Sequence, residues 1–169
     1  MSRQHSKPYL VTTTASYPLE TAEGAFNELW LQTFVFEHSE ALPIAEIEPV
    51  FGPLIPVCTE LGTKAGPVDL VFINSEGLLT IVECKLWKNP EARRQVIAQI
   101  LDYAKEISSW SYEELEDAVR RSSKQKLQSL YQLVASSSEE LDERDFVDSV
   151  DRNLKRGTIL AAHCWQWHS

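Results

Sequence analysis

Residues 66–85 read GPVDLVFINSEGLLTIVECK, two apolar segments separated by the polar sequence Asn-Ser-Glu-Gly. Both segments are rich in Val, Ile, Leu and Phe, and this composition on either side of a short polar break predicts a β-hairpin. Three charged residues interrupt the apolar segments: Asp69, Glu83 and Lys85. Because ionised groups inside a sheet are costly unless they are paired or bind a metal ion, these residues indicate a functional site.

The loop of this hairpin predicts which residues face each other. A three-residue loop, residues 75–77, with glycine where the backbone needs a positive φ, places Asp69 directly opposite Glu83. The β-carbons of such a pair lie roughly 5 Å apart. Side chains alternate along a strand, so Lys85 shares the face of Glu83, and Cys84 points to the other face.

The predicted carboxylate pair is typical of a metal site. Two facing carboxylates repel each other unless a cation lies between them or one takes up a proton. Oxygen ligands suit Mg²⁺ or Mn²⁺, and Mg²⁺ is usually held by one or two carboxylates, here Asp69 and Glu83. The backbone carbonyl of Cys84 can add a ligand, and Lys85 would orient or deprotonate the attacking water. The alternative is a purely structural cluster of the same charges at the end of a sheet.

These residues resemble the motif of the PD-(D/E)xK nuclease superfamily, whose members share the restriction-endonuclease-like fold. The resemblance lies in residues 66–69 (Gly-Pro-Val-Asp), in residues 83–85 (Glu-Cys-Lys) and in the amphipathic helix that follows them. Val68 separates the proline from the aspartate, a spacing that family members tolerate. The resemblance implies an α/β fold with an αβββαβ core, in which helices flank a mixed central sheet and extra helices follow towards the C-terminus.

The resemblance also implies roles for residues outside the hairpin. Several branches of the superfamily carry a Gln and, four residues later, a Tyr on the helix after the Glu-x-Lys strand, and Gln99 and Tyr103 match this pattern. A further acidic residue usually comes from the first helix, where Glu28 is the best match and Glu23 the second choice. The implied catalytic residues are Glu28, Asp69, Glu83, Lys85 and Gln99. The implied metal ligands are Asp69, Glu83, the Cys84 carbonyl and Glu28.

The charge of the chain bears on its partners. The formal net charge is −9 at pH 7, and an acidic protein repels nucleic acid at long range, so this charge argues against a DNA partner. Basic residues nevertheless cluster just after the predicted site, and Lys88 and Arg93 are predicted to bind substrate with Gln99 and Tyr103. A second basic segment, residues 120–126, is more typical of a solvated helix face.

Apolar spacing predicts helices on both sides of the hairpin. A first helix is predicted to begin at Thr21. Its predicted buried residues are Phe26, Leu29, Trp30 and Phe34. Several prolines precede the hairpin, so residues 54–61 are predicted to form a short edge strand. The helix after the hairpin is predicted to begin at Pro90, with Asn89 as its cap. Its predicted buried residues are Val96, Ile97, Ile100, Leu101, Ala104 and Ile107.

The chain is predicted to form one domain in three parts. Residues 1–18 are expected to be a flexible lead-in, residues 19–110 the nuclease-like core, and residues 111–169 a helical extension. The expected helices of the extension are 111–121, 124–135 and 139–155. A strand beginning at Thr158 is expected to stop after Ala162, which would leave an exposed sheet edge through which two copies could pair.

Length and composition are typical of a single globular domain without disulfides. At 169 residues and 43% hydrophobic, the chain can bury one core without disulfides or a structural metal. No apolar segment is long enough to span a membrane, and the N-terminus lacks a signal-peptide pattern, so a cytoplasmic location is expected. The three cysteines are widely spaced and odd in number, which favours reduced thiols.

The sequence thus predicts a Mg²⁺- or Mn²⁺-dependent nuclease that hydrolyses phosphodiester bonds of DNA. The alternative is a catalytically inactive nuclease-like domain that serves as a protein- or nucleic-acid-binding module, since fold does not secure function. A purely structural α/β protein, in which Lys85 only neutralises the carboxylate pair, is the third possibility.

Overall fold

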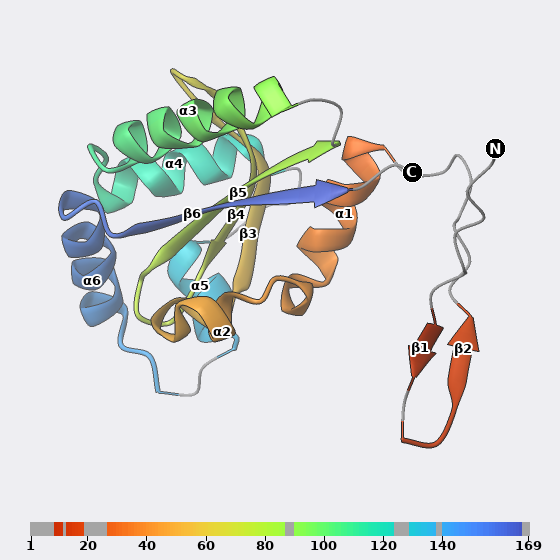
Figure 1. Ribbon diagram of the computed structural model, residues 1–169. Helices are drawn as coiled ribbons and strands as arrows, with labels where there is room; N and C mark the ends of the chain where they lie inside the picture. Colours follow the sequence, from red (N-terminus) through yellow and green to blue (C-terminus); the bar gives the residue numbers. More distant parts are fainter. Residues whose placement is uncertain are drawn as a thin grey trace.

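The chain folds around a four-stranded mixed sheet with helices on both faces (Figure 1). The computed structural model describes residues 9–11, 13–18, 27–86, 90–123, 129–137 and 140–166. The strand order is β3-β4-β5-β6, and the first three strands are antiparallel while β6 runs parallel to β5. The strands are β3 (Ile55–Thr63), β4 (Gly66–Ile73), β5 (Leu79–Leu86) and β6 (Ile159–Gln166).

The predicted hairpin is present as β4 and β5, and its predicted register is confirmed. The paired residues run from Ile73 and Leu79 beside the turn to Leu70 and Val82. Gly77 has a φ of +70°, the left-handed conformation that the predicted three-residue loop requires. The local sequence of the turn therefore fixes the alignment of the two strands that carry the charged residues.

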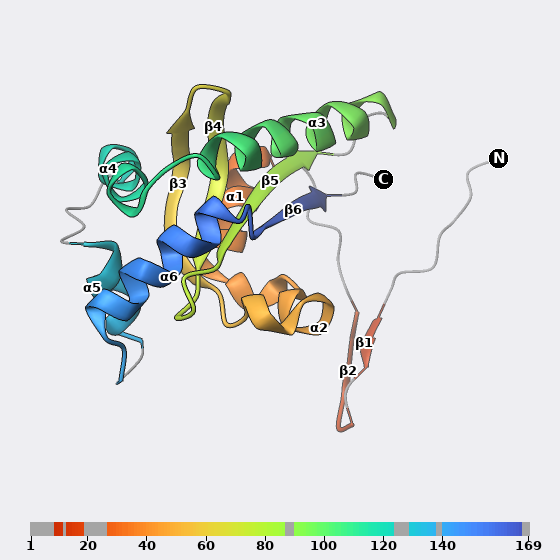
Figure 2. The same ribbon diagram turned by 90° about the vertical axis from the view of Figure 1, so that its left-hand side faces the viewer.

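Strand alternation divides the core into two faces. Val71, Ile73 and Ile81 belong to the larger core cluster, whereas Leu70 and Val82 belong to the smaller one. The larger cluster is covered by α3, α4, α5 and α6, and the smaller one by α1, as Figures 1 and 2 show. The helices are α1 (Glu28–Glu37), α2 (Ile44–Ile47), α3 (Pro90–Ile107), α4 (Tyr112–Ser122), α5 (Leu130–Ala135) and α6 (Glu143–Lys155). Two short 3₁₀ helices are η1 (Ser39–Ala41) and η2 (Pro49–Phe51).

The first helix differs from its prediction in start and in orientation. Asn27 is its N-cap, and the side chain of Asn27 accepts a hydrogen bond of 2.8 Å from the backbone N–H of Trp30. The predicted start at Thr21 and the predicted buried residue Phe26 lie outside the described residues. Leu31 and Val35 form the buried face, whereas the predicted core residues Leu29, Trp30 and Phe34 are exposed. Apolar side chains of α1 point to most sides of the helix, so their spacing alone did not identify the face that meets the sheet.

In α3, the first residue is Pro90 as predicted, but the buried stripe is rotated. Val96, Ile100, Tyr103 and Ile107 are buried, whereas Ile97 and Leu101, both predicted to be buried, are exposed. The buried residues recur at intervals of four and three, which is the spacing of one helix face. Contact with the sheet therefore selected one of two neighbouring apolar stripes.

The N-terminal segment and the last strand both form β-structure. Within the expected lead-in, β1 (Tyr9–Val11) and β2 (Ser16–Pro18) form a separate two-stranded antiparallel sheet, and the expected flexibility of this segment stays a prediction. β6 does not stop after Ala162 but continues to Gln166, and all eight of its residues pair with β5. Backbone pairing with a neighbouring strand stabilises this segment despite its mixed composition.

The predicted positions of the edge strand before the hairpin and of the C-terminal helices are confirmed in outline. β3 lies at one edge of the sheet, and helices occur in each of the three expected C-terminal segments. α5 begins at Leu130, with Ser129 as its cap, and residues 124–128 lie outside the described part of the chain. β6 forms the other edge of the four-stranded sheet, the edge at which pairing of two copies is predicted. Among the described helices, none has the length and hydropathy that crossing a bilayer requires.

Candidate active site

The candidate site lies at the end of the sheet where β4 begins and β5 ends. The pairing of these strands stops at Leu70 and Val82. Beyond this pair, the backbone N–H of Cys84 donates to Oδ2 of Asp69 at 2.7 Å. The Asp69 carboxylate therefore binds the backbone of β5 directly, which holds it beside Glu83, the next residue opposite it in the register.

Lys85 lies between two carboxylates. Its Nζ is 3.0 Å from Oε1 of Glu83 and 3.9 Å from Oε2 of Glu28. Glu83 is buried, with 1% of its surface exposed, whereas Lys85 and Glu28 are partly exposed. The structure thus brings together four residues that the sequence placed in the site, three from the hairpin and one from α1.

A fifth residue of the site was not predicted. The side chain of Gln32 hydrogen-bonds the Asp69 carboxylate. Gln32 lies one turn after Glu28 on α1, so both project towards the same end of the sheet. Its spacing from Glu28 was the one signal in the sequence, and it could be recognised only once the face of α1 was known.

Burial governs the ionisation of the carboxylate pair. Burial raises the pKa of Asp69, although the hydrogen bond from the Cys84 backbone opposes this shift. Burial also raises the pKa of Glu83, and the charge of Asp69 raises it further. Each carboxylate therefore favours a proton or another cation nearby more than an exposed carboxylate would.

Lys85 remains a cation in this environment. Burial would lower its pKa, but the hydrogen bond from Lys85 to Glu83 and the charges of Glu83, Asp69 and Glu28 raise the pKa above its usual value. An ammonium group with a raised pKa is protonated at neutral pH. The site therefore presents a fixed positive charge and not a neutral amine.

The hydrogen bonding of the Glu83 carboxylate indicates whether the site suits a divalent metal ion. Oε1 is bonded to Lys85, whereas Oε2 is buried and has no hydrogen-bond partner among the described residues. A buried carboxylate oxygen without a partner is costly, and a cation can satisfy it. Beside the second carboxylate, Asp69, this oxygen fits the ligand chemistry of Mg²⁺ or Mn²⁺.

The number of protein ligands is small. In the part of the chain that the structure describes, no group of three or more His, Cys, Asp or Glu residues is arranged to hold a metal ion. Mg²⁺ usually takes one or two carboxylates and completes its shell with water and substrate phosphates. Asp69 and Glu83 meet that requirement.

Gln99 and Tyr103 approach the site from α3. The Nε2 of Gln99 donates to the hydroxyl of Tyr103, which is itself buried. Burial raises the pKa of Tyr103, and the charges of Glu83 and Asp69 raise it further, so Tyr103 lies within electrostatic reach of the carboxylate pair. The Tyr103 hydroxyl accepts the hydrogen bond of the Gln99 amide and so helps to fix the position of that amide.

The other predicted site residues are not placed. Lys88 and Glu23 lie outside the described residues. Arg93 belongs to α3, but its side chain is outside the described part of the structure. Their predicted roles stay predictions.

In comparisons with protein-family models, with curated proteins and with solved structures, nothing matched this chain.

Proposed function

We propose that this protein is a metal-dependent nuclease that hydrolyses phosphodiester bonds of DNA. The observation that carries the proposal is the buried Oε2 of Glu83, which has no hydrogen-bond partner among the described residues and lies beside Asp69 and next to a protonated Lys85. Three carboxylates, of Glu28, Asp69 and Glu83, share the single positive charge of Lys85, so one divalent cation would balance the remaining negative charge. The order α1, β3, β4, β5, α3 and then β6 also fits the αβββαβ core of the restriction-endonuclease-like fold, with α4 to α6 as additional helices.

Asp69, Glu83 and the backbone carbonyl of Cys84 would hold Mg²⁺ or Mn²⁺. Glu28, whose Oε2 lies 3.9 Å from Nζ of Lys85, would orient the acidic cluster, and its role as a further ligand stays a prediction. When bound, the ion would supply Lewis-acid stabilisation of the negative charge that develops on the phosphate. Gln32 and the Cys84 N–H hold the Asp69 carboxylate in place, as residues that orient metal ligands commonly do.

The protein side chains divide the remaining tasks. Water attacks phosphorus in line with the leaving oxygen, and Lys85 orients that water and offsets charge on the phosphate. A raised pKa makes Lys85 a poor general base, so orientation and charge stabilisation are its roles. Gln99, held by Tyr103, would donate its amide N–H to a phosphate oxygen.

Cleavage assays test this function directly. Purified protein with Mg²⁺ or Mn²⁺ should cut at least one of single-stranded, duplex and branched DNA. Lys85→Ala should reduce the cleavage rate by about 100-fold or more, because an oriented water and a charge-stabilising group are both lost. Lys155→Ala, which removes an exposed lysine of α6, should cut as the wild type does.

Two outcomes would contradict the proposal. All three DNA substrates could remain intact with both metal ions, or Lys85→Ala could cut as fast as the wild type. Thermal unfolding of each variant checks that the fold is intact.

The net charge of −9 favours a second candidate, a nuclease-like domain that binds a protein partner. Calorimetry separates the two candidates. A nuclease should take up Mn²⁺ in a manner that depends on Asp69 and Glu83, whereas a module with a dead site should not.

A further inference from the structure

A pocket separate from the candidate site lies at the turn between β3 and β4. Its volume is about 460 Å³, within the range of small-ligand sites. The turn, the C-terminal end of α3 and one side of α4 enclose it, and Figure 2 shows the turn beside the end of α3. The pocket is lined by charged and aromatic side chains, among them Lys64, Glu106, Trp110, Glu114, Asp117 and Arg121.

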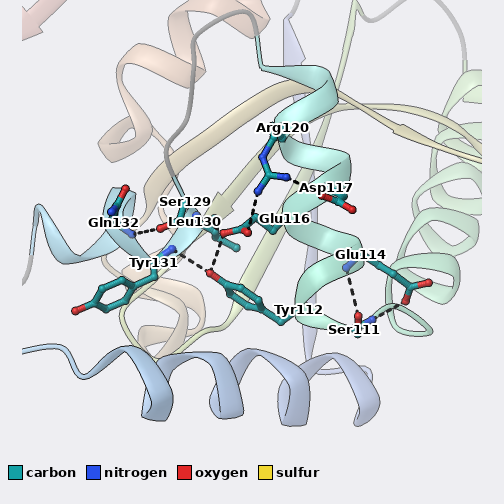
Figure 3. A network of polar contacts seen from close by, with 10 residues as sticks. All are labelled: Ser111, Tyr112, Glu114, Glu116, Asp117, Arg120, Ser129, Leu130, Tyr131 and Gln132. Carbon is teal, nitrogen blue, oxygen red and sulfur yellow. Dashed lines mark hydrogen bonds and ion pairs between the residues drawn. The ribbon is translucent and has the colours of Figure 1, made fainter.

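The three carboxylates of this pocket are already engaged. Both oxygens of Glu106 accept backbone N–H groups of the turn, from Lys64 at 2.8 Å and Ala65 at 3.0 Å. Glu114 accepts the N–H of Ser111 at the start of α4, and Asp117 is paired with Arg120 at 2.8 Å (Figure 3). These acids therefore stabilise the walls of the pocket, and their charges are partly compensated.

The cations of the pocket are not engaged in this way. Within the described part of the chain, neither Lys64 nor Arg121 forms an ion pair. Trp110 lies with them and is half-buried, so one part of its indole packs on the core while the rest faces the pocket. An aromatic surface beside two cations that form no ion pair with the described residues suits a ligand that is both aromatic and anionic.

The pocket is close to the candidate site along β4. Gly66, the first residue of β4, lies so near Tyr103 that a methyl group on Gly66 would be 3.4 Å from the Tyr103 hydroxyl. Asp69 follows three residues later on the same strand, a rise of roughly 10 Å. A polymer bound at the candidate site could therefore reach the pocket within a few of its units.

We infer that this pocket binds one nucleotide of an unpaired strand, with its base against Trp110 and its phosphates near Lys64 and Arg121. The second oxygen of each carboxylate, Oε1 of Glu114 and Oδ2 of Asp117, accepts no hydrogen bond from the described residues and can accept an N–H group of the base. A nucleotide is the ligand class that uses all three kinds of group in the pocket: the indole, the cations and the acceptors. A base in a duplex is stacked and paired, so only a single strand can enter.

The inference rests on the proposed nuclease function for its choice of ligand, and it specifies the substrate as single-stranded DNA or DNA with an unpaired segment. Binding can be measured without cleavage. In EDTA, the anisotropy of a labelled single strand of about 12 nucleotides, compared with a duplex of the same length, reports the affinity of each form.

Trp110→Ala should weaken single-strand binding roughly fivefold or more, because a stacked base loses its platform. Trp110→Phe should keep most of the affinity. Arg121→Ala should weaken single-strand binding and lower the slope of log affinity against log salt by about one. Arg156→Ala, at the exposed end of α6, is the matched control and should bind as the wild type does.

The inference is overturned if the wild type does not bind the single strand, if Arg121→Ala and Trp110→Ala both bind as the wild type does, or if duplex binding falls by the same factor. Arg121 is exposed, so its variant decides the matter should Trp110→Ala fail to fold. If the wild type cleaves DNA but both variants bind the single strand with unchanged affinity, the proposed role of the pocket is wrong and the proposed nuclease function stands. If the wild type binds the single strand through Trp110 but cleaves no DNA, the proposed nuclease function is wrong and the proposed role of the pocket stands.

Discussion

Asp69 and Glu83 are buried carboxyl groups with raised pKa values, so they hold protons more tightly in the folded protein than in the unfolded chain. Stability from such groups is present below their unfolded pKa values and is lost as the pH rises through the folded values. The unfolded values are 3.8 for Asp69 and 4.5 for Glu83. At neutral pH the metal-free pair is therefore a source of instability.

Asp69→Asn should stabilise the metal-free protein. An asparagine oxygen can still accept the Cys84 N–H, while the repulsion with Glu83 disappears. A gain of about 1 kcal/mol would raise the Tm of a chain of this size by roughly 2–4 °C. Thermal unfolding in EDTA should show this gain at pH 7.5 and a smaller gain near pH 4, where the wild-type pair already binds protons.

Asp148→Asn, on the exposed side of α6, is the control and should leave the Tm unchanged. A lower Tm for Asp69→Asn would favour the structural reading, in which Lys85 needs both carboxylates.

Residues of the hairpin were predictable because turn chemistry and strand alternation act over short distances. Glu83, Asp69 and Lys85 were found in this way, and so was the register that joins them. Gln32 was not found, because its spacing from Glu28 is informative only once the face of α1 that meets the sheet is known. The lack of a hydrogen-bond partner for Oε2 of Glu83 within the described part of the chain is likewise a property of the assembled site.

At the scale of the element, α1 shows how a helix can be recognised while its face is not. Its sequence carries apolar residues on most sides, and the stripe chosen from the sequence contains Leu29, with 69% of its surface exposed. Leu31, two positions later, is buried against the sheet. The pair offers a matched test on one helix.

Leu31→Ala should lower the free energy of unfolding by about 2–4 kcal/mol, the usual cost of a cavity at a buried leucine. Leu29→Ala should change it by less than about 0.5 kcal/mol, since the side chain is in solvent. Chemical denaturation of both variants measures the difference. Equal losses, or a greater loss for Leu29→Ala, would contradict the orientation of α1.

In α3, too, the position of the helix was predictable, whereas its buried face was not. Its start at Pro90 was predictable from local chemistry. Leu101, predicted to be buried, is exposed, and Tyr103, which was not among the predicted buried residues, is buried. A rotation by one residue suffices, because neighbouring stripes of this helix are both apolar. The burial of Tyr103 matters for the site, since it holds Gln99 there.

At the scale of the whole molecule, the candidate site exists only in the folded chain. Its groups come from α1, β4, β5 and α3, which are separated in sequence and meet at one end of the sheet. An ion bound by these groups would bind the folded protein and not the unfolded chain, so its binding energy would add to the free energy of unfolding.

Mn²⁺ should therefore raise the Tm of the wild type. At 100 times its dissociation constant, an ion specific for the folded state adds about 2.7 kcal/mol. For a chain of this size, the rise in Tm is roughly 5–10 °C. Glu83→Gln should show little or no rise, because it removes one predicted ligand. An equal rise in the Tm of Glu83→Gln would mean that Mn²⁺ binds at another site.

The sequence by itself determined the β4–β5 hairpin, its register and the three charges that it carries, because a turn and the alternation of a strand involve neighbours in the chain. The tertiary structure decided which faces of α1 and α3 are buried, that Gln32 and Tyr103 support the site, and that β6 continues to Gln166 along β5. These features depend on contacts between segments far apart in the chain. The free energy of these contacts depends on the surface that each segment packs against, and the local sequence of one segment does not specify that surface.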